Sequence, residues 1–202
     1  MENANERLAD FLFEVGTLRR INRSHRQNLL VNDDTDNIAS HSFRVTWIGW
    51  HLAKLEGADP HKVTMMCLLH DLGEARSNDM NWIHKRYVTV HDDEITEEQL
   101  GTLPFPELKE LVQEYSARQS LEAKVAKDSD NLDQILLLKE YEWQGNQEAA
   151  RWLRGDEAKD GRHRLDRLYT KAGRALGEAI YAREPSKWWE DLWTNKNRTS
   201  TE

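Results

Sequence analysis

The chain has 202 residues, with 28 Lys and Arg against 36 Asp and Glu, so its formal charge is −8 at pH 7. This length suits one domain with a single core, and the acidic balance excludes a nucleic-acid coat, which needs excess positive charge against phosphates. No apolar run approaches the ~20 residues that cross a bilayer, and the N-terminus lacks the basic-then-apolar plan of a signal peptide. We therefore expect a cytoplasmic protein with neither membrane nor nucleic-acid polymer as a partner.

Helical spacing dominates the first part of the chain. Apolar side chains recur every three or four residues over 6–21, and a polar loop follows over 22–36. A second helix is expected to begin within 36–40 and to run to Leu55, because Gly57 supplies a C-terminal stop.

The rest of the chain also indicates helices. Asp59 and Pro60 form an N-cap followed by proline at the first helical position. Later elements are expected as a short helix and loop within 78–102, helices near 107–116 and over 118–143, and two C-terminal helices over 162–182 and 187–193. No run shows the strict alternation of a half-buried strand, and no repeat is visible. The prediction is an all-α, single-domain bundle over 1–202, with core motifs in about 18–142 and residues 155–202 packing on the same domain.

Cys67 is the single cysteine, so the chain cannot form an internal disulfide. This usage favours a reducing compartment. Its apolar neighbours in MMCLLH indicate a buried thiol that serves packing rather than metal binding.

Two histidines lie at the ends of apolar stripes on successive predicted helices. The stripe that starts at His41 continues at positions i+4, i+7 and i+11, and His70 ends the stripe of the next helix, with Asp71 beside it. Imidazole and carboxylate together suit Mn, Fe, Co, Ni or Zn, and water completing a six-fold shell would argue against a tetrahedral structural zinc. A histidine in such a stripe also occurs as a core residue bonded to a carbonyl, so the residues alone leave both interpretations open.

An acidic run in the long helix over 118–143 offers a further ligand. Helical periodicity places Asp128 near the centre of the leucine-rich stripe and Asp130 on the opposite side. Periodicity alone therefore favours Asp128.

Three ordered motifs, IASHSFRV around His41, CLLHDLGEARSND and AKDSDNLDQILLLKEYE, resemble the HD-domain metal-dependent phosphohydrolases. The nearest subgroup is the 5′-deoxynucleotidases and their HD-domain relatives, and the resemblance spans about 18–142. It implies a compact helical bundle with one divalent metal ion (Mn, Co, Fe, Ni, Zn or Mg). Its ligands would be His41, His70, Asp71 and Asp130, so the motif favours Asp130 over Asp128.

The same resemblance implies catalytic and substrate-binding residues. Glu74 would accept the proton of a metal-bound water or orient it, and Asp79 matches a second acid beside the reaction centre. Arg23 and Lys85 match cations near the phosphate, whereas Arg86 fits a solvated surface equally well. A divalent ion lowers the pKa of bound water, so that hydroxide forms near neutral pH. The phosphoryl group that this hydroxide attacks is anionic, so positive side chains around its oxygens stabilise the reaction.

The sequence departs from the subgroup at the substrate loop. Ser24 stands where the deoxynucleotidases have a Trp near the sugar, and Ser40 stands where a Glu precedes the first ligand. The loop is also longer by about three residues and carries an acidic run over 33–36. That run is not an EF-hand, since it lacks Gly at the sixth position and has Arg44 at the twelfth. Sugar selectivity is therefore left open.

The leading hypothesis is a phosphohydrolase that releases phosphate from a nucleoside 5′-monophosphate or a similar small phosphate ester. A nucleoside di- or triphosphate is the alternative substrate. A di-iron HD oxygenase is a minor alternative, because His84 and His91 lie only seven residues apart, unlike the widely separated histidines of that group.

A metal-free binding module is the remaining alternative. Its support is an aromatic cluster near the C-terminus, formed by Trp188, Trp189, Leu192 and Trp193. We expect this cluster to pack on its own domain or to close a homodimer.

Overall fold

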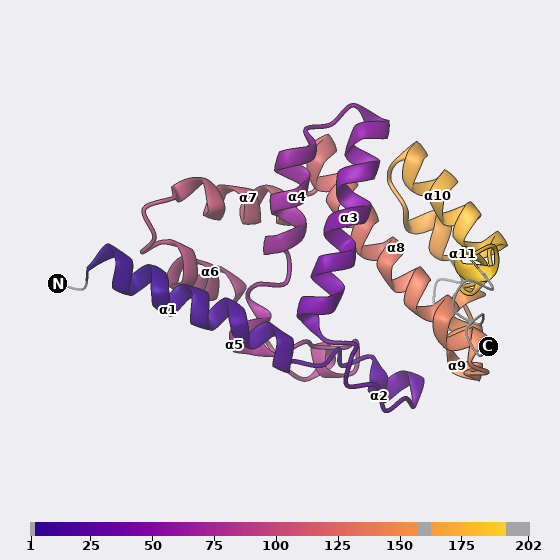
Figure 1. The fold of residues 1–202 in the computed structure, drawn as a ribbon. Helices are drawn as coiled ribbons and strands as arrows, with labels where there is room; N and C mark the ends of the chain where they lie inside the picture. Colours follow the sequence, from indigo (N-terminus) through magenta and orange to yellow (C-terminus); the bar gives the residue numbers. More distant parts are fainter. Residues whose placement is uncertain (1–2, 157–162, 193–202) are drawn as a thin grey trace, which may run out of the picture.

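Two long helices, α3 (Ile38–Glu56) and α8 (Leu121–Trp143), form the centre of the fold (Figure 1). The computed structural model describes residues 3–156 and 163–192. α4 (Pro60–Leu69) packs against both long helices, and α10 (Lys171–Ala182) lies along α8. The described residues form an all-α fold, which confirms the predicted class.

Shorter elements surround this centre. They are α1 (Ala4–Thr17), η1 (Leu18–Arg20), α2 (Arg26–Leu29), α5 (Glu74–Ser77), η2 (His84–Arg86), α6 (Asp92–Leu100), α7 (Pro106–Ala117), α9 (Gln147–Leu153), η3 (Arg164–Arg167) and α11 (Lys187–Glu190). In Figure 1, α6 and α7 lie on the side of the N-terminus, whereas α9 to α11 lie on the side of the C-terminus. The β-type pairing in the described ranges is limited to one isolated antiparallel bridge, between Asn22 and Asn37.

Side-chain caps fix where the central helices begin. Asn37 accepts the backbone N–H of Ser40 while Ser40 Oγ accepts the N–H of Asn37, which is a reciprocal cap on α3. α3 ends at Gly57, whose φ of 74° is readily adopted by glycine. Asp59 caps α4, with Pro60 in its first turn. These caps confirm the start within 36–40, the stop at Gly57 and the start at Asp59.

The structure corrects several predicted boundaries in the N-terminal half. The first helix ends at Thr17 and continues only as a 3₁₀ turn, and the predicted loop over 22–36 contains the one-turn helix α2. α4 ends at Leu69, so a turn separates His70 from Glu74, which begins α5. His70 and Glu74 are therefore not joined by one continuous helix.

The C-terminal part also differs from the prediction. α9 was not expected, and the predicted helix over 162–182 is divided into η3 and α10, because Thr170 caps a new helix. Of the predicted C-terminal segment, residues 157–162 and 193–202, with Trp193, lie outside the described residues. α11 covers only one turn, and Trp188 remains 72% exposed.

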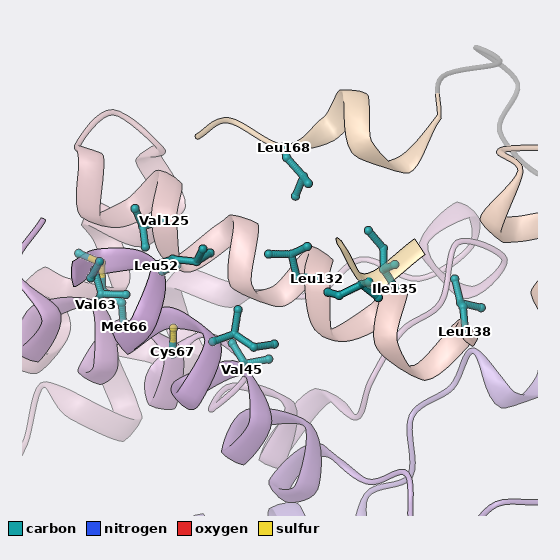
Figure 2. Packing of buried hydrophobic residues seen from close by; sticks show 14 of the residues in the cluster. Val45, Leu52, Val63, Met66, Cys67, Val125, Leu132, Ile135, Leu138 and Leu168 are labelled. Carbon is teal, nitrogen blue, oxygen red and sulfur yellow. The ribbon is translucent and has the colours of Figure 1, made fainter. Parts of the chain in front are cut away.

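The main core lies where α3, α4 and α8 meet (Figure 2). Its fully buried members include Val45, Leu52, Val63, Met66, Cys67, Val125, Leu132, Ile135, Leu138 and Leu168. A smaller cluster beside it joins η1 and the start of α3 to α6 through Leu18, Ile38 and Leu100. Cys67 is a buried packing residue, as predicted, and burial raises the pKa of its thiol to about 12.

Asp128 serves the connection between α8 and α10. It is fully buried and accepts three hydrogen bonds, from Tyr169 N, Thr170 N and Thr170 Oγ1, at 2.7, 2.8 and 2.7 Å. Periodicity therefore placed Asp128 in the core correctly, but the partner is the start of α10. Among the described helices, none has both the length and the apolar character needed to cross a bilayer.

Gly49 marks the closest approach of the three central helices. A Cβ atom there would lie 2.6 Å from Cys67 Sγ on α4 and 3.3 Å from Ser129 Oγ on α8. Only a residue without a side chain allows this packing.

We predict that Gly49→Ala lowers the free energy of unfolding by about 2 kcal/mol, because the added methyl group overpacks the contact with Cys67. Chemical denaturation followed by circular dichroism measures this change. Gly16→Ala is the matched control: a Cβ at that position of α1 meets nothing within 4 Å, so stability should stay constant or rise by up to ~1 kcal/mol. Equal stability of the two variants would contradict the close packing at Gly49.

Candidate functional site

The histidines and the first aspartate of the predicted ligand set meet at one end of the central helices. His41 lies in the first turn of α3, His70 follows the last residue of α4, and Asp71 is next to it. His41 Nε2 is 3.1 Å from His70 Nε2 and 3.4 Å from Asp71 Oδ2, and His70 Nε2 is 3.1 Å from the same oxygen. Within the described chain, these three residues form the one group of His, Cys, Asp or Glu side chains close enough to share a metal ion.

Asp130 faces this group from α8. Its Oδ1 is 3.4 Å from His41 Nε2 and 3.9 Å from His70 Nε2, whereas its Oδ2 accepts a hydrogen bond from Lys127 Nζ at 2.6 Å. Asp130 is outside the three-residue group in which all donor atoms lie within 4.8 Å of one another. Asp128 lies two residues before Asp130, on the opposite side of the helix, and accepts hydrogen bonds from the segment that begins α10.

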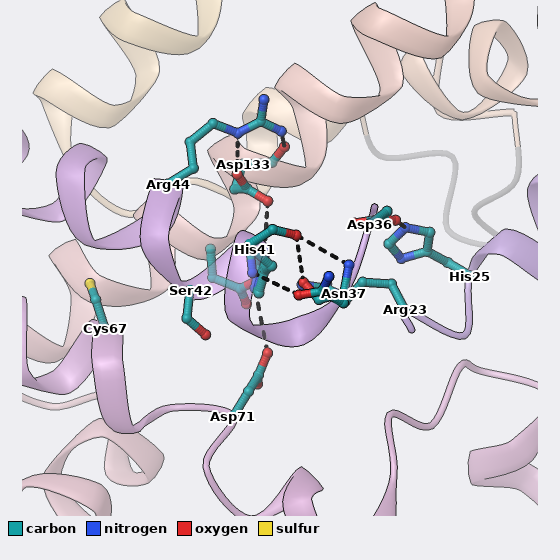
Figure 3. Close-up of polar contacts among 12 residues, drawn as sticks. Arg23, His25, Asp36, Asn37, His41, Ser42, Arg44, Cys67, Asp71 and Asp133 are labelled. Carbon is teal, nitrogen blue, oxygen red and sulfur yellow. Dashed lines mark hydrogen bonds and ion pairs between the residues drawn. The ribbon is translucent and has the colours of Figure 1, made fainter. Parts of the chain in front are cut away.

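The orientation of both imidazoles fits metal binding. His41 Nδ1 lies 2.6 Å from Asp133 Oδ2 (Figure 3). His70 Nδ1 lies 2.8 Å from the carbonyl oxygen of Cys67. Because a proton on each Nδ1 satisfies these acceptors, each Nε2 faces the cluster and offers its lone pair to a cation when the ring is neutral. Two imidazole nitrogens with carboxylate oxygens are a donor set for a divalent transition metal. The residues present therefore fit the implied ion.

Asp133 connects the cluster to a chain of charges behind it. Arg44 Nε donates to Asp133 Oδ1 at 2.5 Å, and Arg44 Nη1 donates to Glu140 Oε1 at 2.6 Å. Burial alone would raise the pKa of Asp133, but the bonds from His41 and Arg44 outweigh it and hold this pKa below its ordinary value. Sequence reasoning assigned no role to Asp133 or Arg44. The sequence feature that could have identified them is helical spacing. Asp133 lies three residues after Asp130, and Arg44 lies three residues after His41, so each shares a helix face with an expected ligand.

Both central carboxylates remain ionised despite their burial. Burial alone would raise the pKa of Asp71, but the charge of His70 and the hydrogen bond from His41 hold it well below its ordinary value. The pKa of Asp130 is lowered in the same way, against burial, by Lys127 and the two histidines. Ionised carboxylates are the form that binds a cation.

A cavity of about 730 Å³ opens beside these residues. It brings together, among others, Arg23, His70, Asp71, Glu74, Asp79, Lys85 and Asp130. His41 borders a second, smaller cavity together with Arg44 and Asp133. A separate apolar groove of about 840 Å³ lies between α3 and α10, and none of the predicted site residues lines it.

Glu74 is an unpaired acid in this cavity. Its Oε2 is buried without a hydrogen-bond partner. Burial, together with the negative charges of Asp71 and Asp79, raises the pKa of Glu74 to about 9. A carboxyl group in such surroundings can hold or release a proton within the neutral range once its neighbours change their charge.

Arg23 is a buried cation with free donors. The residue is only 9% exposed, and its Nε and Nη1 lack hydrogen-bond partners. Nε lies 3.6 Å from Asp79 Oδ2, which gives an ion pair without a hydrogen bond. Burial would lower the pKa of Arg23, but Asp71, Asp130 and Asp79 raise it, so the guanidinium keeps its charge. Lys85, by contrast, is exposed.

The residues at which the sequence departs from the subgroup have structural partners. Ser24 donates its backbone N–H to Asp79 Oδ2 at 2.6 Å, and Ser40 completes the cap of α3. In the acidic run, Asp33 accepts the N–H and hydroxyl of Thr35 and the hydroxyl of Tyr141, and Asp34 accepts bonds from Asn22 and Arg26. The hydrogen bonds that these acids accept therefore stabilise the loop itself. His84 and His91 do not belong to the metal-compatible group that the described residues contain.

Comparison with solved structures finds the same overall fold in other proteins. A Pyrococcus furiosus protein described as a conserved hypothetical protein is 27% identical, with a TM-score of 0.69 over 87% of this chain and 99% of that chain. A Pyrococcus horikoshii OT3 protein is 26% identical, with a TM-score of 0.68 over 86% of this chain and 96% of that one. A search of curated proteins found no match.

A third structure shares the fold at lower identity. It is described as a predicted metal-dependent phosphohydrolase from Magnetospirillum magnetotacticum MS-1, and it is 23% identical, with a TM-score of 0.67 over 90% of this chain and 95% of that one. The family profile described as HD domain matches residues 15–167, which include every residue of the cluster. The chain belongs to the HD domain family.

Proposed function

We propose that this protein is a metal-dependent phosphohydrolase that releases phosphate from a nucleoside 5′-monophosphate or a similar small phosphate ester. The observation that carries the proposal is the buried guanidinium of Arg23, whose free Nε and Nη1 share one cavity with His70, Asp71 and Asp130. A buried cation with unused donors beside a metal-compatible cluster suits an anionic substrate. The structural neighbour from Magnetospirillum, described as a predicted metal-dependent phosphohydrolase, supports the same chemistry.

His41, His70, Asp71 and Asp130 would hold the divalent ion, as the resemblance implies. When bound, such an ion lowers the pKa of coordinated water and polarises a phosphoryl oxygen. Glu74 would accept the proton of the attacking water. A cation on Asp71 would offset one of the charges that raise the pKa of Glu74, so this carboxylate would be available near neutral pH.

Arg23 and Lys85 would hold the phosphoryl oxygens. Arg23 is fixed and dehydrated, so its donors act in a low-dielectric setting where their effect on developing charge is large. Lys85 is exposed and would close the solvent side of the phosphate. Asp79 borders Arg23 and the cavity, which is consistent with its expected place beside the reaction centre.

The cavity favours a monophosphate over a longer phosphate chain. Three further cations line it, but each already has a partner: Lys109 with Glu97, Lys127 with Asp130, and Arg118 over the ring of Tyr115. Asp92 and Asp93 of α6 add negative charge to the same wall. A second or third phosphate would thus meet few free donors.

We further propose that the enzyme is a cytoplasmic homodimer that pairs through the outer face of α3. One side of this helix carries apolar side chains that are buried in the core. On the other side, Phe43, Trp47 and Trp50 are 66, 56 and 39% exposed. A patch of large exposed apolar side chains of this kind is typical of a protein–protein contact. A two-fold axis would place the same stripe of each subunit against the other. The lone buried Cys67 suits a reducing cytoplasm.

The function is tested by loading the protein with Mn²⁺, Co²⁺, Fe²⁺, Ni²⁺, Zn²⁺ or Mg²⁺ and measuring phosphate release from nucleoside mono-, di- and triphosphates and small phosphate esters. We predict turnover of monophosphates, and its loss together with bound metal in Asp71→Ala, at an unchanged helical signal. Two controls should keep both metal and turnover: Asp10→Ala on the exposed face of α1, and Asp128→Asn, whose side chain serves α10. No hydrolysis by any metal form, or an active Asp71→Ala variant, would contradict the proposal.

We predict that Glu74→Gln keeps the metal content of the wild type and lowers kcat by about 10² to 10⁴-fold, because the amide cannot accept a proton. Steady-state kinetics and metal analysis of the same preparations measure the two quantities. Glu110→Gln, at an exposed position of α7, is the matched control and should leave kcat unchanged. A Glu74→Gln enzyme with wild-type kcat would remove Glu74 from the reaction.

For the homodimer, we predict a mass of twice the 23.7 kDa chain by light scattering, and the monomer mass for Trp47→Glu, since a carboxylate in the paired stripe would be buried. Trp82→Glu is the control: this Trp is 66% exposed and lies in another part of the surface, before η2. A monomeric wild type would refute the pairing.

A further inference from the structure

The two cations proposed to bind phosphate come from segments about sixty residues apart, and one buried side chain joins these segments. We propose that Asn81 is a positioning residue that sets Arg23 and Lys85 relative to each other, so that the cavity presents a preformed phosphate cradle. The inference rests on the proposed function, since it concerns the phosphate side of the same cavity. It adds a residue that belongs neither to the metal-compatible cluster nor to the lining of the cavity.

Asn81 uses its whole side chain. The residue is 7% exposed, and its Nδ2 donates to Ser24 O at 3.0 Å and to Gln27 Oε1 at 3.1 Å. Its Oδ1 accepts the backbone N–H groups of Ile83 and His84 at 2.9 and 3.1 Å. An amide has two donor hydrogens and two acceptor lone pairs, so all four positions are filled. The donors reach the Arg23 segment, and the acceptor serves the Lys85 segment.

On the Arg23 side, Ser24 is held at both of its backbone groups. Its N–H donates to Asp79 Oδ2 at 2.6 Å, and its carbonyl accepts from Asn81. Asp79 and Asn81 are two residues apart, so one short segment clamps the residue that follows Arg23. Arg23 itself donates its backbone N–H to Asp36 O at 2.9 Å. The backbone is thus fixed on both sides of the guanidinium, whose Nε and Nη1 stay free.

On the Lys85 side, Asn81 forms the turn that carries the lysine. The bonds from Ile83 and His84 to Oδ1 begin the 3₁₀ turn η2, and Lys85 N donates to the backbone oxygen of Asn81 at 3.0 Å. Among the residues that the structure describes, none forms a hydrogen bond or ion pair with the exposed side chain of Lys85. The turn therefore fixes the position from which this side chain extends. Loss of Asn81 would therefore loosen both cations without removing either charge.

Two substitutions remove different sets of these hydrogen bonds. Asn81→Asp keeps an acceptor for Ile83 and His84 but removes both donors to Ser24 and Gln27. Asn81→Ala removes all four bonds. The matched control is Asn146→Ala: Asn146 also caps a helix, through Ala149 N at 2.8 Å, and also donates to a distant carbonyl, Leu29 O at 2.7 Å, but it lines a different cavity.

The experiment measures binding of inorganic phosphate to the metal-loaded protein by titration calorimetry, together with KM, kcat, metal content and the free energy of unfolding. For Asn81→Asp and Asn81→Ala we expect the phosphate Kd and KM to rise about tenfold, which is the scale of one to two lost buried hydrogen bonds. We expect kcat within about twofold of the wild type and full metal content. Asn146→Ala should lose similar stability with unchanged Kd and KM.

Each outcome decides the matter. A rise in Kd and KM confined to the Asn81 variants supports the positioning role, because a merely structural loss would also appear in Asn146→Ala. Wild-type Kd and KM in folded Asn81 variants, or the same rise in Asn146→Ala, would overturn the inference and leave the proposed function intact. A wild type that neither binds phosphate nor hydrolyses any ester would overturn the proposed function, and the inference with it.

Discussion

The close approach of α3, α4 and α8 at Gly49 is the constraint on which the candidate site depends. The missing side chain lets Cys67 of α4 and Ser129 of α8 come against the backbone of α3. Helices are rigid, so this contact also fixes their neighbouring turns. His70 follows Cys67 by one turn, Asp130 is the residue after Ser129, and His41 lies about two turns before Gly49. One packing contact therefore brings together donors that are up to ninety residues apart in the chain.

Buried charge at this site is compensated locally. Asp71 lies against His70, Asp130 against Lys127, and Asp133 against Arg44, which offsets part of the cost of removing each carboxylate from water. The net charge of −8 describes the whole surface, whereas the cavity contains a cation, Arg23, whose donors are free. Global acidity and an anionic substrate are thus compatible, because the field in a cleft is set by its nearest groups.

The loop between η1 and α3 shows how a polar segment becomes rigid enough to carry a functional cation. The bridge between Asn22 and Asn37 closes it, and the buried pair of His25 and Asp36, at 2.8 Å, fills its interior. The acids over 33–36 are used as acceptors within the loop or for Tyr141. Their pattern in the sequence could suggest a cation site, but their hydrogen bonds give them a structural role.

The sequence by itself determined the helical class, the ends of α3 and the start of α4, because caps and apolar periodicity act over a few residues. It also nominated His41, His70, Asp71 and Asp130, through motifs whose spacing puts each at the end of a core stripe or on the long helix. Periodicity preferred Asp128 and the motif preferred Asp130, and the structure shows what each acid contacts. Tyr169 and Thr170, just before α10, provide three donors to Asp128, while Lys127 and the histidines surround Asp130. The tertiary structure alone decided the roles that involve distant partners, such as Asp133 with Arg44 and Asn81 with Ser24. Local sequence patterns encode the face on which a side chain lies, but the neighbour it meets depends on how the helices pack.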